Sequence, residues 1–497
     1  MQTYYLKQIS DNLVPDIINP SPDYYCTWQT QLYATSDGKP AAQRAIICEK
    51  SLFDTDKPFG WAHFYKAARK DLILVMDDSW DVPPNNDSTY YGCLQLNAEK
   101  FPTFTKNKTN SQALKCLSEK IKGLGWKGFG VWVCAQESKF NNQPKDKYWQ
   151  NVFECMNTSD IAYWKVDWGE SCNSFEFRKE LTDYAHKYAP NLIIEHAMLK
   201  EILPYCNVFR TYDVPAIMSI PMTLQKIAEF SDISADDSAN MGMLNCEDEA
   251  YIAAAGGFTM GIMRHPYSGD FLNGRPDMSF PAVHRNLKTK MYEIIRATRW
   301  HRIAPAFPIS PGQFKVSRLK LTDNWKFKDI SGEIEEWWLR QPLINRDLID
   351  GTLTKHAPSS ITRNTILPEI EPDTAGNIPY CVASINPNGA FSITTLGRTI
   401  GRDYYIPKCN IAAYSQNADT VGIFGEYKTL ALKTEINGIR QVLMQDLAGD
   451  ICFDVTANIS INGREIHIPG ELIAAIGTSA QPVSDTSEPG VVLKLIK

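Results

Sequence analysis

The chain has 497 residues, of which 43% are hydrophobic and 22% charged, the proportions of an ordinary soluble globular protein, so disordered and fibrous classes are excluded. This length exceeds the usual size of one hydrophobic core and predicts two domains. The formal net charge of −6 is spread along the chain with no basic block, which argues against a nucleic acid partner.

The N-terminal segment and the cysteines bear on the compartment. Residues 1–10, MQTYYLKQIS, lack the apolar core of a signal peptide, and no run approaches the roughly 18 apolar residues of a membrane span. We therefore expect a soluble protein, either cytoplasmic or, with a leader removed, periplasmic or secreted. Twelve scattered cysteines without a C-x-x-C pair predict mostly reduced thiols and no zinc site.

From about residue 24 to 305, short apolar runs alternate with amphipathic helical stretches. The predicted strands are 24–31, 71–80, 128–135, 161–168, 192–197, 207–213, 242–246 (the weakest) and 258–266. The predicted helices between them include 60–70, 111–125, 175–189, 221–230 and 247–257. Parallel strands need such crossovers, and eight of them close an α/β fold of the (β/α)₈ TIM barrel type. A doubly wound open sheet is the alternative, but no glycine-rich dinucleotide fingerprint follows any strand.

The character of the sequence changes after the proline-rich segment 299–314. Short alternating strands follow, separated by Asn-Gly and Pro-Asn-Gly turns, as in CVASINPNGAFSITTLG and ISINGREIHIPG. This pattern predicts an all-β antiparallel sandwich. The expected domains are therefore a catalytic barrel over 1–310 and a β-sandwich over 311–497.

Charged and aromatic residues recur where the predicted barrel strands end. In chain order they are Trp28, Asp77, Asp78, Trp132, Lys165, Asp167, Glu195, Arg210 and Asp213. In a parallel barrel these strand ends meet on one face, which carries the functional site. Carboxylates bind sugar hydroxyls and aromatic rings pack on the apolar face of a pyranose, while two acids on different strands could flank a glycosidic bond.

Asp167 is the best candidate for a nucleophile in this group. Lys165 lies two residues earlier on the same face of the strand, so its charge is expected to lower the pKa of Asp167 and keep the carboxylate ionised. Taken singly, each residue has a structural explanation: a strand-end ion pair for Lys165 and Asp167, and a helix cap or turn for Asp77 and Asp78. Their joint placement favours the catalytic interpretation.

Five segments resemble glycoside hydrolase clan D, chiefly family 27, the α-galactosidases and α-N-acetylgalactosaminidases. In chain order these are LILVMDDSWD, GCLQLNAEKFPTF, GLGWKGFGVWV, YWKVDWG and YCNVFRTYD. The resemblance covers most of residues 24–305, and a following β domain is also typical of the family. It implies a retaining exo-α-glycosidase that releases terminal galactose from oligosaccharides or glycoconjugates, with no metal and no organic cofactor.

The resemblance also implies a role for each matching residue. Asp167 would be the nucleophile and Asp213 the general acid and base. The hydroxyls at C4 and C6 would be held by Asp77 and Asp78. Further ring hydroxyls would be bound by Lys165 and Arg210, between aromatic walls formed by Trp28 and Trp132.

Two regions differ from the family pattern or bear on the choice of sugar. The spacing from Arg210 to Asp213 is one residue shorter than usual, so Asp236 and Asp237 are the alternative acids. Glu195 and Met198 are the residue types that face a 2-hydroxyl in galactose-specific members. They disfavour, without excluding, an α-N-acetylgalactosaminidase, and a β-L-arabinopyranosidase or a non-catalytic carbohydrate-binding barrel stays open. The sequence is also compatible with a homo-oligomer.

Overall fold

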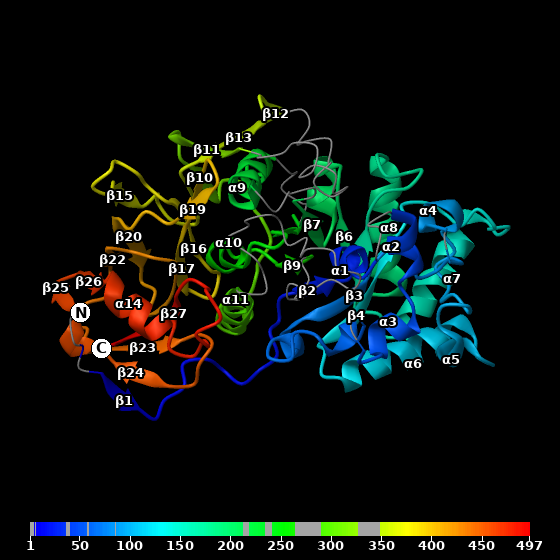
Figure 1. Ribbon diagram of the computed structural model, residues 1–497, viewed down its shortest axis with the longest axis horizontal. Coiled ribbons are helices and arrows are strands. Elements are labelled where there is room, and N and C mark those ends of the chain that lie inside the picture. The colour runs from blue at the N-terminus through cyan, green and yellow to red at the C-terminus, as the bar shows by residue number, and fades with distance from the viewer. Residues whose placement is uncertain are drawn as a thin grey trace.

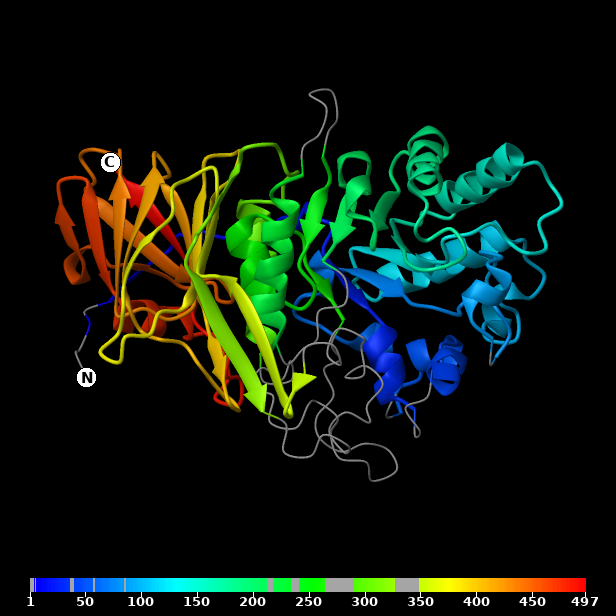
Figure 2. The same cartoon turned by 90° about the horizontal axis from the view of Figure 1, so that it is seen from above.

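The computed structural model describes residues 4, 6–35, 40–56, 59–84, 86–211, 218–233, 241–263, 290–326 and 348–497. Two β-rich regions lie side by side in it, with a layer of helices between them (Figures 1 and 2). Three acids named above, Asp213, Asp236 and Asp237, fall outside the described residues.

Eight parallel strands form the first region. They are β2 (Tyr24–Cys26), β3 (Ile73–Met76), β4 (Gly128–Val133), β5 (Tyr163–Val166), β6 (Ile193–His196), β7 (Val208–Arg210), β8 (Met243–Asn245) and β9 (Gly261–Ile262). Each strand pairs with the next from β2 to β8, and β9 returns to pair with β2. A parallel bridge between Asn245 and Thr259 joins β8 to the segment before β9. The predicted TIM barrel, including its weak seventh strand, is confirmed.

Helices connect these strands and cover the barrel. They are α1 (Trp28–Tyr33), α2 (Pro40–Ala45), α3 (Glu49–Phe53), α4 (Ser88–Tyr91), α5 (Pro102–Thr105), α6 (Asn110–Gly123), α7 (Lys145–Thr158), α8 (Phe175–Tyr188), α9 (Ser219–Phe230), α10 (Ala250–Gly256) and α11 (Met291–Ile303). The Thr109 hydroxyl accepts a hydrogen bond from the Gln112 amide at the start of α6, a cap that stabilises a helix by about 1 kcal/mol. The helices expected over 111–125, 175–189, 221–230 and 247–257 are confirmed as α6, α8, α9 and α10.

The helix expected over 60–70 is wrong. That segment forms only two 3₁₀ turns, η1 (Trp61–His63) and η2 (Arg69–Asp71). Gly60 and Tyr65 have φ of 85° and 54°, and a left-handed residue inside the segment interrupts the α-helical hydrogen-bond series. The apolar side chains Trp61 and Ala62 are nevertheless buried, so the periodicity reported burial rather than helix.

The two faces of β5 separate as the alternation of its sequence predicts. Trp164 faces outward and packs on Phe153 of α7, with ring centroids 4.6 Å apart. Tyr163 faces the barrel interior, where its ring centroid lies 5.1 Å from that of Tyr24 on β2. Lys165 has the parity of Tyr163 and therefore also points inward.

The second region is a sandwich of two sheets. The larger contains, in spatial order, β1 (Lys7–Ile9), β24 (Cys452–Asp454), β23 (Gln441–Asp446), β27 (Gly490–Ile496), β21 (Thr420–Phe424), β17 (Phe391–Leu396), β16 (Tyr380–Ile385), β14 (Ser360–Arg363) and β10 (Phe314–Val316). The smaller contains β15 (Glu369–Glu371), β20 (Asn410–Gln416), β22 (Thr429–Thr434), β26 (Glu465–Pro469) and β25 (Ser460–Asn462). Helix α14 (Gly470–Gly477) packs on β23, β26 and β27.

A buried core fills the space between these two sheets. Ile393 and Val421 of the larger sheet share it with Ile411, Leu430 and Ile466 of the smaller one. Most neighbouring strands are antiparallel, whereas β14–β16, β17–β21 and β20–β22 are parallel pairs. Shorter sheets are formed by β11 (Lys320–Lys326), β12 (Leu348–Ile349) and β13 (Thr352–Pro358), and by β18 (Arg398–Ile400) and β19 (Asp403–Tyr405). The predicted C-terminal β-sandwich is confirmed.

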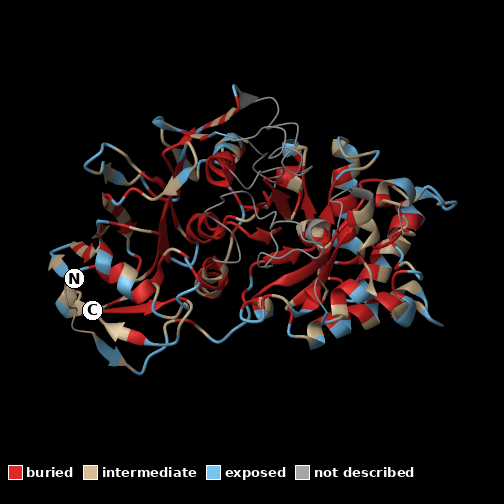
Figure 3. Cartoon of the chain, in the orientation of Figure 1, coloured by how far each residue is buried: buried red, intermediate tan, exposed pale blue. Residues whose placement is uncertain are grey.

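Helices α10 and α11 lie between the barrel and the larger sheet, and they are largely buried (Figure 3). The Arg296 guanidinium on α11 forms an ion pair with Asp446 on β23, with Nε and Oδ1 2.9 Å apart. On β14, Arg363 donates hydrogen bonds to the backbone carbonyls of Gly256 and Gly257 at the end of α10. Strand β1 also pairs with β24, so the N-terminus joins the sandwich. A domain boundary near residue 310 stays a prediction.

Two further observations concern sequence expectations. All twelve cysteines are described and none forms a disulfide. Within the described ranges, none of the helices has both the length and the apolar character needed to span a bilayer.

Candidate active site

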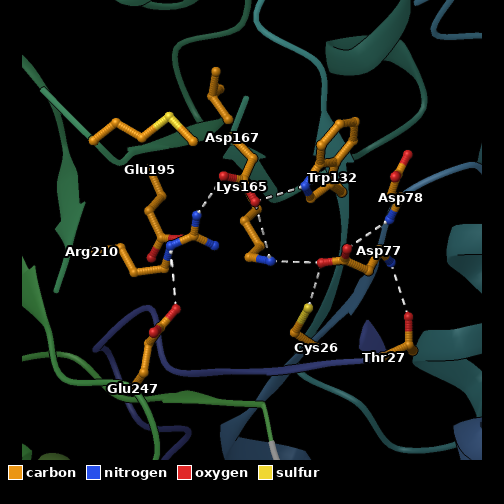
Figure 4. Close-up of polar contacts among 12 residues, drawn as sticks. Cys26, Thr27, Asp77, Asp78, Trp132, Lys165, Asp167, Glu195, Arg210 and Glu247 are labelled. Carbon is orange, nitrogen blue, oxygen red and sulfur yellow. Dashed lines mark hydrogen bonds and ion pairs between the residues drawn. The ribbon is translucent and has the colours of Figure 1, made fainter. Parts of the chain in front are cut away.

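The carboxyl ends of β3 to β7 bring seven of the predicted residues together in one cup. Figure 4 shows Asp77 and Asp78 after β3, Trp132 on β4, Lys165 and Asp167 at the end of β5, Glu195 on β6 and Arg210 on β7. Each comes from a short strand whose inward positions alternate with outward apolar ones. The sequence therefore predicted the composition of this cup correctly.

Asp167 is a buried carboxylate held by three partners. The indole N–H of Trp132 donates to its Oδ2 at 3.0 Å, and Lys165 Nζ lies 3.9 Å from the same oxygen. Arg210 Nη2 lies 3.1 Å from Oδ1. Burial raises the pKa of Asp167, but Arg210 and then Lys165 outweigh it, so the pKa is lowered and the carboxylate is ionised at neutral pH.

Lys165 has a closer partner than the one expected from the sequence. Its ammonium lies 2.7 Å from Asp77 Oδ2, against 3.9 Å from Asp167. Burial lowers the pKa of Lys165, but Asp77 more than compensates and the pKa is raised, so the lysine stays charged. Arg210 is thus the nearer cation to Asp167, and Lys165 links the two carboxylates from below.

Asp77 and Asp78 are oriented by different groups. Asp77 Oδ2 also accepts from the Cys26 thiol at 2.8 Å, while its Oδ1 accepts from the backbone amide of Asp78 at 2.8 Å. Asp78 Oδ2 pairs with Arg44 Nε at 2.9 Å. Burial raises the pKa of Asp78 to about 6, partly offset by Arg44. Asp78 is therefore the carboxylate of the cup whose charge changes near neutral pH.

Glu195 lies deeper than the other acids and has a full set of protein donors. Tyr163 donates to its Oε2 at 2.8 Å, Tyr24 to its Oε1 at 3.1 Å, and the Asn245 amide also donates to Oε2. Its side chain is 1% exposed, and burial raises its pKa despite Arg210 nearby. Glu195 therefore forms part of the floor on which Arg210 rests.

Glu247 is a site residue that the sequence reading did not name. It follows β8, and its Oε1 lies 3.3 Å from Nε of Arg210, so Asp167 and Glu247 hold the same guanidinium from two sides. The signal was present in the sequence, because Glu247 stands at the end of the seventh predicted strand. Arg44 gave no comparable signal, since it comes from α2 rather than from a strand end.

Three other predicted residues occupy different places. Trp28 begins α1 and is half-buried against the interior cluster of Tyr24 and Cys26. Met198 follows β6 in a left-handed conformation, with its sulfur 4.0 Å from Nη2 of Arg178. Asp213 lies outside the described residues, so the structure does not report on its role.

The charges around Asp167 restrict its chemistry. Two cations, Lys165 and Arg210, already surround it, which disfavours a bound metal ion at the same carboxylate. Its Oδ1 accepts no hydrogen bond of normal geometry from the residues that the structure describes. An ionised, buried carboxylate oxygen at the open end of a barrel is suited to nucleophilic attack on an electrophilic carbon.

No protein-family model matches the chain, and no curated protein sequence matches it. Several solved structures are similar over nearly the whole chain. A family 27 β-L-arabinopyranosidase from Geobacillus stearothermophilus has 11% identity and a TM-score of 0.41, with 96% of this chain and 97% of the other covered. A candidate α-N-acetylgalactosaminidase from Bacillus halodurans has 11% identity and a TM-score of 0.39, covering 98% and 100%. An Anoxybacillus α-amylase has 9% identity and a TM-score of 0.41, covering 96% and 98%. These likenesses are too weak to separate one activity from another.

Proposed function

We propose that this protein is a retaining exo-α-glycosidase that removes terminal α-linked galactose from oligosaccharides or glycoconjugates. The observation that carries the proposal is Asp167: a carboxylate that is buried yet kept ionised by Arg210 and Lys165, at the open end of a (β/α)₈ barrel. Paired acceptors at Asp77 and Asp78 beside it suit a polyhydroxylated ring. The order of five family 27-like segments in the sequence supports the same conclusion.

The proposed mechanism has two displacements. Trp132 fixes Oδ2 of Asp167, which leaves Oδ1 to attack C1 of the sugar as the bond to the leaving oxygen breaks. Asp213, or one of Asp236 and Asp237, protonates that oxygen and then takes a proton from water. The water attacks C1 from the opposite side and displaces Asp167, so the anomeric configuration is retained.

Hydrolysis of nitrophenyl α-galactoside, followed by NMR of the first-formed sugar, tests this proposal. We expect α-galactose before mutarotation, and turnover faster than on nitrophenyl α-N-acetylgalactosaminide or β-L-arabinopyranoside. First-formed β-galactose would contradict the double displacement. Faster turnover of either competing glycoside would keep the chemistry and change the sugar, whereas binding of galactose without hydrolysis of any glycoside would make the barrel a carbohydrate-binding module.

The pKa of Asp78 predicts a pH dependence of substrate recognition. If its carboxylate accepts a sugar hydroxyl, protonation below about pH 6 removes an acceptor, so kcat/KM should fall as the pH drops through about 6. Asp167 has a lowered pKa and stays ionised over this range. In Asp78→Asn, the remaining activity should lose this acidic limb. An unchanged limb in the variant would assign it to another group.

A further inference from the structure

Trp168 is an exposed aromatic residue directly after the proposed nucleophile. Its side chain is 41% exposed, whereas Asp167 is 7% exposed. Large aromatic side chains are usually buried, because each removes a large apolar area from water. An exposed indole at the mouth of a polar cup is therefore a candidate contact surface for a ligand.

The backbone around Trp168 is held firmly against the end of β4. The Trp168 carbonyl accepts a hydrogen bond from the Ala135 amide at 3.1 Å, and the Ala135 carbonyl accepts from Ser171 at 2.9 Å. A Cβ at Gly169 would lie 2.8 Å from both the Ala135 nitrogen and the Cys134 sulfur, so only glycine fits there. This close packing fixes the backbone that carries the indole.

The indole lies toward the Asp78 side of the cup. The central guanidinium carbon of Arg44 is 5.8 Å from the ring centroid, a cation–π distance. The same Arg44 pairs with Asp78 at 2.9 Å and with Asp87 at 3.0 Å. Arg44 therefore links Trp168 to an acid of the cup, and the ring stands at the rim between Asp78 and Asp167.

We infer that Trp168 forms a binding platform for the leaving-group sugar, outside the pocket that holds the cleaved residue. The inference rests on the proposed function. A terminal galactose whose C1 faces buried Asp167 must direct its glycosidic oxygen toward the open rim, where Trp168 stands. The apolar C–H face of a second pyranose packs well on an indole, and the fixed backbone limits the ordering cost of that contact.

Comparison of two substrates tests the platform. Melibiose has a glucose leaving group that can stack on the indole, whereas α-galactosyl fluoride releases only fluoride. In Trp168→Ala, we expect kcat/KM on melibiose to fall by about tenfold, the size of one aromatic contact, with activity on the fluoride unchanged. Trp168→Phe keeps a ring and should recover most of the loss.

The outcomes separate this inference from the proposed function. Equal kcat/KM of wild type and Trp168→Ala on melibiose would overturn the platform and leave the glycosidase proposal intact. A parallel loss on both substrates would also overturn it, because it would show an effect on Asp167 or on folding instead. Absence of hydrolysis of both substrates by the wild type would contradict the proposed function itself.

Discussion

Replacement of Asp167 by glycine should abolish turnover of nitrophenyl α-galactoside, with a loss of roughly four orders of magnitude or more in kcat, as expected when a nucleophile is removed. Glycine also leaves space where the carboxylate stood. Azide should enter this space, attack C1 from the same side and restore activity. Because only one displacement then occurs, the product should be β-galactosyl azide, identified by NMR.

Two variants make this result specific to the chemistry. Asp167→Asn keeps the size and shape of the side chain, so it should be equally inactive while retaining the wild-type fold by circular dichroism. Asp183→Asn changes an exposed aspartate on α8 and should have wild-type activity. Substantial activity in Asp167→Asn, or an α-azide product from Asp167→Gly, would assign the nucleophile to another residue.

Replacement of Asp213 by glycine should have the second largest effect, and its size should depend on the leaving group. Natural galactosides leave as poor anions and need protonation, so their hydrolysis should slow by about 10²- to 10⁴-fold. An activated aryl galactoside needs little protonation, so its first step should be nearly normal. Azide should then intercept the glycosyl-enzyme and give α-galactosyl azide, since two displacements retain configuration.

The same measurement on other acids identifies the acid/base residue. Asp236→Gly and Asp237→Gly are the matched comparisons, because each lies just beyond Asp213 in the chain. If one of them gives the α-azide while Asp213→Gly does not, the acid/base role moves to that residue. Glu247→Gln should give no azide product, since Glu247 pairs with Arg210 and is expected to position it.

Much of the barrel and its cup could be predicted from the sequence for a physical reason. Parallel strands that are buried on both faces produce short apolar runs, and the first polar residue after each run stands on the functional face. Lys165, Asp167 and Arg210 were found by this rule alone. Glu247 obeys the same rule but follows the weakest predicted strand.

The pairings within the cup could not be read from the sequence. Lys165 is two residues from Asp167, yet it lies closer to Asp77 on another strand, and Arg210 is the nearer cation to Asp167. Such choices depend on strand register and on side-chain length across the barrel. Arg44 reaches Asp78 from a separate helix, a contact between residues 34 positions apart that leaves no periodic pattern.

The buried position of α10 and α11 has a consequence for the independence of the two regions. Tyr251 and Trp300 on these helices pack on Phe424 of the larger sheet, and Arg363 binds the carbonyls at the end of α10. Removing the sandwich would expose these aromatic rings to water and leave the carbonyls without their donor. The helices complete the barrel on the side of β8 and β9, so the sandwich serves as a structural wall of the enzyme rather than as a detachable appendage.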